Sequence, residues 1–198
     1  MAQQLINTGT TPGDDTGTKL YLGGDIINEN FTELYTEVGL KRHGIYNYSD
    51  VATVGTPIAV TGGGGSVALT NDGLGAQTQT FPATGVTDVW DEGTQSFDFS
   101  ELTLGTKVTI RLDILITTTS PNQNVDITMD LAVGGSFPFT IGWDEKVYKN
   151  TAAHNFVVSS FIYIGSTDIQ TNGGVFMIES DSDADVTVNG WSCSVIPY

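Results

Sequence analysis

The sequence is poor in basic residues. Only 7 of its 198 residues are Lys or Arg, against 23 Asp or Glu, and the formal net charge is −16. The imbalance runs along the whole chain: residues 1–50 hold 7 acids and 3 bases, and residues 51–198 hold 16 acids and 4 bases. Phosphate groups and anionic lipid head groups are held mainly by Lys and Arg. We therefore expect the chain to bind neither nucleic acid nor an anionic membrane surface.

Cysteine and long apolar runs are equally scarce. Cys193 is the only cysteine, which excludes a disulfide within the chain. No apolar run approaches the ~20 residues that a membrane-spanning helix needs. Residues 1–20 also lack the basic start and apolar centre of a signal peptide. We therefore expect no membrane insertion, and a protein made and kept in a cytoplasm or in a particle assembled there.

The residue types that are abundant in the chain favour strands and turns. The chain holds 24 glycines and is rich in Thr, Asn, Asp and Ser, a mixture that disfavours long helices. Val108–Ile116 and Val125–Val133 place an apolar residue at every second position, the period of a strand with one buried face. Phe156–Ile164 is apolar on both faces, which predicts a strand covered on both sides, within a sandwich or at a subunit interface.

Shorter segments continue this pattern towards the C-terminus. We expect a hairpin-type turn at Asn71–Gly73 between two short strands. The further predicted strands are Val67–Leu69, Gln77–Phe81, Val175–Glu179, Val186–Val188 and Trp191–Ile196.

No helical pattern follows residue 40, so the fold predicted is mainly β. It consists of an N-terminal loop and short amphipathic helix, then an antiparallel β-sandwich for which a jelly roll is the best single topology. Three parts are expected: residues 1–45 as an attachment and oligomerisation segment, residues 46–66 as a glycine-rich connector, and residues 67–198 as the jelly-roll-like β-sandwich domain.

The one predicted helix starts near Asp25 and ends at Gly39. Ile27, Phe31, Leu34 and Val38 follow one another at intervals of four, three and four, which places them in one narrow stripe. A helix of about four turns is marginal alone and needs a surface to pack against. We therefore predict an interface formed by Leu20, Ile27, Phe31, Leu34, Tyr35 and Val38.

The same N-terminal stretch carries a family resemblance. It has the pattern N-x-G-T, then D-x-T-G, then a helix with I-N-x-N-F-x-E-L-Y. Over about the first forty residues this resembles a segment that recurs in bacteriophage tail-fibre and other virion structural proteins. The residues concerned are Asn7, Gly9, Thr10, Asp14, Asp15, Thr16, Gly17, Ile27, Asn28, Asn30, Phe31, Glu33, Leu34 and Tyr35.

The resemblance implies a protein of the virion, assembled in the host cytoplasm. The first hypothesis is a surface appendage of tail-fibre or adhesin type, docked through its N-terminal segment with the β-domain outward. Its partners would be copies of itself, as a homotrimer by analogy with viral β-heads, and tail or capsid proteins. A capsid decoration (cement) protein is the alternative, favoured by the absence of a long shaft. A tail polysaccharide depolymerase is a third possibility with little support.

The sequence holds no catalytic constellation, so we predict neither enzyme activity nor a cofactor. His43 and His154 each lie far from a nucleophile in the sequence, and there is no G-x-S-x-G motif. His43 is expected to face solvent and His154 to lie at a rim. Cys193 alternates with Trp191 and Val195, which places it in the core as a small apolar group.

Two further groups are candidates for binding. Asp181, Asp183 and Asp185 could converge on a calcium ion, although a solvated acidic turn is the favoured interpretation. Trp90 and Trp143 are each followed by two acidic residues and lie in predicted loops, so either could stack on a host-surface glycan.

Overall fold

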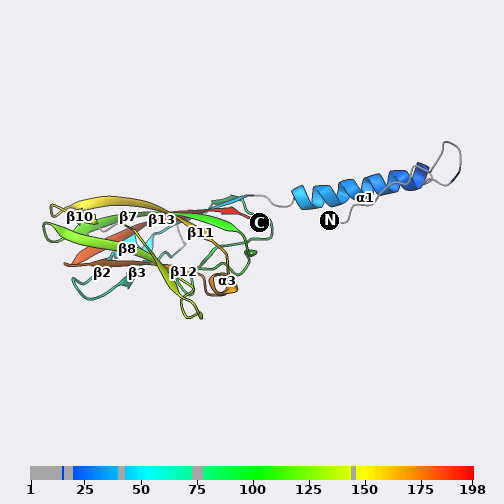
Figure 1. Cartoon of the computed structure of the whole chain (residues 1–198). Helices are drawn as coiled ribbons and strands as arrows, with labels where there is room; N and C mark the ends of the chain where they lie inside the picture. The colour runs from blue at the N-terminus through cyan, green and yellow to red at the C-terminus, as the bar shows by residue number, and fades with distance from the viewer. Residues whose placement is uncertain (1–14, 16–19, 40–42, 73–77, 144–145) are drawn as a thin grey trace. The chain divides into compact units, whose positions relative to one another are not determined.

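The computed structural model describes residues 15, 20–39, 43–72, 78–143 and 146–198 (Figure 1). The chain divides into two compact units, Met1–Arg42 and His43–Tyr198. The first unit contains the helix α1 (Leu20–Gly39), and the second contains every strand of the described chain. Among the described residues, no helix combines the length and the apolar character that crossing a bilayer requires.

Helix α1 ends at Gly39 as predicted, but it begins at Leu20 rather than near Asp25. The start was predicted near Asp25 because Asp is a favoured N-cap residue and negative charge in the first turn suits the helix dipole. The helix instead also includes Gly23 and Gly24.

The second unit is an antiparallel β-sandwich, which confirms the predicted fold class. The first sheet has the strand order β11-β7-β13-β1-β4, and β2 also pairs with β13. Its strands are β1 (Gly44–Ser49), β2 (Ile58–Val60), β4 (Thr78–Phe81), β7 (Lys107–Thr118), β11 (Ala153–Tyr163) and β13 (Ala184–Ile196).

The second sheet has the order β10-β8-β12-β6-β5, with β3 on β12 and β9 on β8. Successive long strands alternate between the two sheets: β7, β11 and β13 lie in the first, and β8 and β12 in the second. This winding is the connectivity of a jelly roll. The strands of the second sheet are β3 (Val67–Ala68), β5 (Trp90–Asp91), β6 (Ser96–Phe97), β8 (Gln123–Leu131), β9 (Phe139–Gly142), β10 (Lys146–Tyr148) and β12 (Gly174–Ser180).

The core lies between the sheets and is filled by the predicted alternation. On β7 the five inward residues from Val108 to Ile116 are fully buried, and on β8 those from Val125 to Leu131 are nearly so. Val133 was predicted to continue this inward set, but it is 51% exposed. The preceding Ala132 has a φ of 55°, which ends the extended backbone and its alternation.

Aromatic rings from both sheets meet in the middle of this core. Trp90 and Trp191 have ring centroids 4.4 Å apart, and Phe97 and Phe176 have centroids 5.5 Å apart, both in edge-to-face geometry. Such pairs stabilise a core by about 0.5–1.5 kcal/mol beyond the area they bury. The contacts therefore tie β5, β6 and β12 of one sheet to β13 of the other.

The predicted connector at residues 46–66 is wrong, because most of it belongs to the sandwich. Strand β1 pairs with both β13 and β4, and its Tyr46 and Tyr48 are buried in the core. The short helix α2 (Ala52–Gly55) and strand β2 follow. The glycine run after β2 forms a loop, as expected.

Three local predictions also differ from the structure. The expected hairpin about Asn71–Gly73 is wrong, since β3 pairs with β12 and β4 pairs with β1. The two strands predicted after residue 185 are one strand, β13, with a bulge between Val188 and Gly190. Helix α3 (Thr167–Asn172) was missed, although Ser166 caps it by accepting a hydrogen bond from the Ile169 backbone N–H at 3.3 Å.

The bulge in β13 depends on glycine at position 190. Gly190 has a φ of 138°, and a Cβ atom there would lie 2.1 Å from the Tyr48 carbonyl oxygen. We predict that Gly190→Ala lowers the free energy of unfolding by about 2 kcal/mol or more, because it combines backbone strain with a steric clash. Urea unfolding followed by tryptophan fluorescence measures the change.

Gly55→Ala is the matched control, since a Cβ at Gly55 meets nothing within 4 Å. If both variants unfold at the same urea concentration as the wild type, the bulge does not require glycine.

Candidate functional site

The predicted interface on α1 is partly visible in the described residues. Ile27 and Phe31 lie one helical turn apart and are 45% and 54% exposed. Residues four apart share one face of a helix, so these two side chains form one apolar strip. The side chains of the other predicted members, Leu20, Leu34, Tyr35 and Val38, lie outside the described part of the structure.

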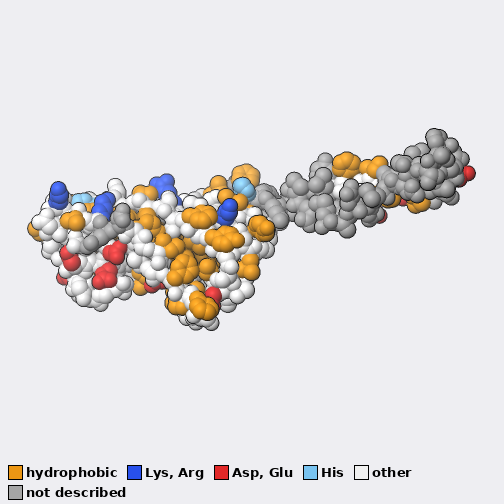
Figure 2. Space-filling view, in the orientation of Figure 1, with side chains coloured by type: hydrophobic (Ala, Val, Ile, Leu, Met, Phe, Trp, Pro, Cys, Tyr) orange, Lys and Arg blue, Asp and Glu red, His pale blue; other side chains and the backbone are white. Residues whose placement is uncertain are grey.

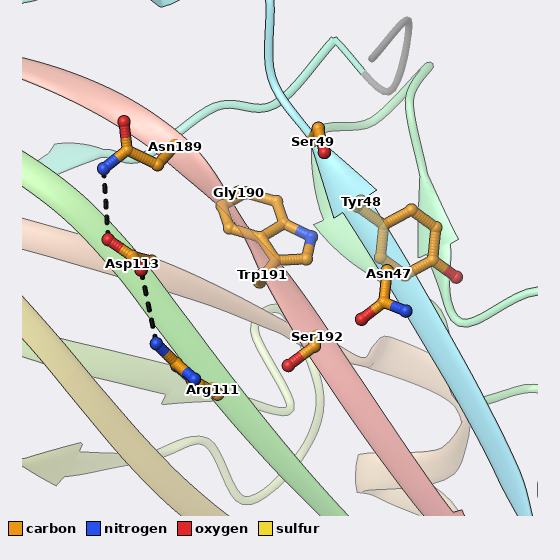
Figure 3. Close-up of a pocket in the computed structure, with 9 residues that line it drawn as sticks. All are labelled: Asn47, Tyr48, Ser49, Arg111, Asp113, Asn189, Gly190, Trp191 and Ser192. Carbon is orange, nitrogen blue, oxygen red and sulfur yellow. Dashed lines mark hydrogen bonds and ion pairs between the residues drawn. The ribbon is translucent and has the colours of Figure 1, made fainter. Parts of the chain in front are cut away.

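A small polar hollow lies on the first sheet where β13 bulges beside β1 and β7 (Figure 3). It encloses about 200 Å³. Asp113 lies on one wall: one carboxylate oxygen accepts a hydrogen bond from Asn189 Nδ2 at 3.1 Å, and the other is 3.4 Å from Arg111 Nη2. Its lining residues are Asn47, Tyr48, Ser49, Arg111, Asp113, Asn189, Gly190, Trp191 and Ser192.

The chemistry of this hollow suits hydrogen bonding rather than catalysis. Asp113 is the only carboxylate among its lining residues, and both of its oxygens are engaged by neighbours. Glycoside hydrolysis needs two carboxyl groups facing each other across the substrate. Neither Arg111 nor Asp113 was predicted as a site residue, because charged side chains on the outward face of a strand are ordinary surface residues and only the β13 bulge brings Asn189 to them.

The two tryptophans proposed as glycan contacts are less exposed than expected. Trp90 is 4% exposed and donates a hydrogen bond from its indole nitrogen to the Asn71 carbonyl at 3.2 Å. Its predicted exposure is wrong because the ring completes the aromatic core. Trp143 is half-buried and packs against the core, with its ring centroid 5.6 Å from that of Phe176.

The acidic turn before β13 has a structural partner. The Asp183 carboxylate accepts a hydrogen bond from the Gly62 backbone N–H at 2.9 Å, which holds the glycine loop against the turn. Asp185 lies within β13 opposite Ala59. Over the described ranges, the structure does not gather Asp181, Asp183 and Asp185, or any other three His, Cys, Asp and Glu residues, into a group that could hold a metal ion.

The remaining candidates lie where the sequence placed them. His43 is exposed and His154 is half-buried, with its ring centroid 4.4 Å from that of Tyr148. Cys193 is 1% exposed and points into the core. Burial raises the pKa of its thiol well above the usual range, and the negative charge of Asp88 raises it further. A thiol held in the neutral form is a poor nucleophile.

Comparison with known proteins leaves the family open, because no family model and no curated protein matches the chain. Among solved structures, the PRD1 vertex protein P5 is 11% identical, with a TM-score of 0.40, over 79% of this chain and 73% of that one. Eiger TNF from S. frugiperda is 6% identical, with a TM-score of 0.44, over 80% and 94%. The cowpea mosaic virus top component is 10% identical, with a TM-score of 0.28, over 80% and 82%. At these scores the likenesses bear on neither family nor function.

Cys193 supplies a test of the core. We predict that the thiol does not react with Ellman's reagent in the folded protein, because it is buried and its raised pKa keeps it protonated. It should become reactive at the urea concentration at which the sandwich unfolds. Full labelling of the folded protein within seconds would contradict this placement.

Proposed function

We propose that this chain is a structural protein of a bacteriophage virion, acting as a homotrimeric surface appendage of tail-fibre type. Residues 1–42, the first compact unit, dock it onto the particle and onto its own copies, and the β-sandwich is presented outward. The function is association rather than turnover, so the protein is not an enzyme and uses no cofactor. The hypothesis begins from the resemblance of the first forty residues to virion proteins.

The observation that carries the proposal is the exposed strip of Ile27 and Phe31 on α1. Both residues belong to the motif on which the resemblance rests. Fully burying an Ile or Phe side chain contributes about 1.5–3 kcal/mol relative to leaving it exposed. A helix that leaves two such side chains in water gains that free energy only when another surface covers them.

The surface charge supports a protein partner. With a net charge of −16, the molecule repels nucleic acid and anionic membranes. Apolar contact does not depend on a cationic face, because burial of apolar area is non-directional and needs no charge. A strip without charge on a strongly acidic protein is therefore best matched by an apolar protein surface.

The role of α1 can be tested by placing a charge on its strip. We predict that Ile27→Asp and Phe31→Asp each reduce incorporation into virions by at least tenfold, because a carboxylate buried at an apolar interface costs several kcal/mol. The measurement is quantitative immunoblotting of purified particles.

Thr32→Asp is the matched control, since Thr32 is also exposed on α1 but lies beside the strip. Cys193 protection confirms that the sandwich stays folded in all three variants. Normal incorporation of both strip variants would remove the role given to α1.

Copy number separates a tail appendage from a head protein. We predict tens of copies per virion, measured by gel densitometry of purified particles against a major capsid band. Hundreds of copies would place the protein on the head, as a decoration protein that bridges capsid subunits.

A further inference from the structure

We propose that the outer face of the first sheet holds a second self-association surface, covered by another copy of this chain. The surface is a row of five residues, one from each strand across the sheet, and we call it the outer row. The inference concerns the β-sandwich and does not rest on the function proposed for α1. The outer row consists of Phe161, Thr109, Ser194, Ile45 and Phe81.

Strand pairing makes the row continuous. Phe161 on β11 pairs with Thr109 on β7, which pairs in turn with Ser194 on β13. Ser194 pairs with Ile45 on β1, and Ile45 pairs with Phe81 on β4. Directly paired residues project from the same face of a sheet. With about 4.8 Å between strands, the row is about 20 Å long.

The outer row and its neighbours are unusually apolar for a surface. Phe161, Ile45 and Phe81 are 57%, 55% and 62% exposed. Tyr163 and Ile196, both paired with Lys107, continue the patch and are 53% and 37% exposed. Figure 2 shows that hydrophobic side chains are exposed at several places on the sandwich.

The size of the patch fits a protein interface. An aromatic side chain presents about 150–250 Å² when fully exposed, so five large side chains exposed by about half offer on the order of 500 Å². Each partner in a specific protein interface buries about 800 Å². The five large side chains, Phe161, Ile45, Phe81, Tyr163 and Ile196, would therefore form the apolar centre, with Lys107, Thr109 and Ser194 adding polar area.

Charge favours a second copy as the occupant. Two molecules that each carry a net charge of −16 repel each other, so contact is least costly where carboxylates are absent. No member of the outer row is charged. Its member Thr109 is flanked on β7 by Lys107 and Arg111, two of the four basic residues in residues 43–198. The row is thus the part of this face where another acidic chain meets apolar and cationic groups.

The edge strand β11 supports the same conclusion. It is eleven residues long, contains no Asp, Glu, Lys, Arg or Pro, and pairs with β7 alone among the described strands. Monomeric proteins usually protect such an edge with charge, proline or a bulge. Its inner residues Phe156 and Val158 pack against the core, whereas its outward residues Val157, Phe161 and Tyr163 are 50%, 57% and 53% exposed. Phe156–Ile164 was predicted to be covered on both sides, and a second copy on the outer row would cover the outward side.

The experiment measures self-association of the full-length chain by sedimentation velocity at about 1–100 µM. The Phe31→Asp background is used throughout, so that the α1 strip is disabled. We expect this protein still to self-associate through the outer row. Adding Phe161→Asp or Ile45→Asp should raise the dissociation constant at least thirtyfold, the size expected at a central interface residue.

Phe137→Asp in the same background is the matched control. Phe137 is 80% exposed but lies in the loop before β9, outside the outer row, so its substitution should leave the dissociation constant unchanged. Protection of Cys193 from Ellman's reagent shows that each variant is folded. Using two separate row positions ensures that one misfolded variant does not decide the result.

Two outcomes would overturn the inference. One is a Phe31→Asp protein that is monomeric at every concentration, which would leave α1 as the only self-association surface and the proposed function intact. The other is unchanged association of the folded row variants. Failure of α1 variants to affect virion incorporation would instead count against the proposed function alone.

Discussion

The burial of alternating side chains between two antiparallel sheets is the interaction on which the rest of the structure depends. Strand β7 contributes five fully buried residues from Val108 to Ile116 and is paired along its whole length, with β11 on one side and β13 on the other. A register shift of one residue would turn all five towards solvent. That constraint fixes which residues of β11 and β13 point outward, and therefore fixes the composition of the outer row.

Much of this arrangement could be predicted from residue patterns. The period of two in β7 and β8 predicted which residues of these strands face the core. The spacing of Cys193 to Trp191 and Val195 predicted that the cysteine is also buried there. The burial of Trp90 could not be predicted, because its place in the core depends on Phe97 and Trp191, which come from other strands. Strand β1 was not predicted, because its alternation is short and its partners β13 and β4 lie far away in the sequence.

The candidate surfaces also differ in whether the sequence alone predicts them. The strip on α1 follows from one local period, and the sequence predicts it directly. The outer row takes one residue from each of five strands, so only the strand order brings Ile45, Phe81 and Phe161 together. The polar hollow about Asp113 is similar, because it forms where the β13 bulge meets β1 and β7. A surface built across a sheet can be predicted only when the strand order is known. No local pattern in a single sequence gives that order.

The exposed apolar groups are the places where we propose that this strongly acidic protein assembles. Long-range repulsion keeps molecules apart except where apolar groups replace carboxylates, and both α1 and the first sheet offer such places. The most direct test is the mass of the wild-type full-length chain in solution, measured by sedimentation equilibrium at micromolar concentration. We predict a homotrimer of about 63 kDa, three times the 21.0 kDa chain. A single species of 21.0 kDa at all concentrations would contradict it.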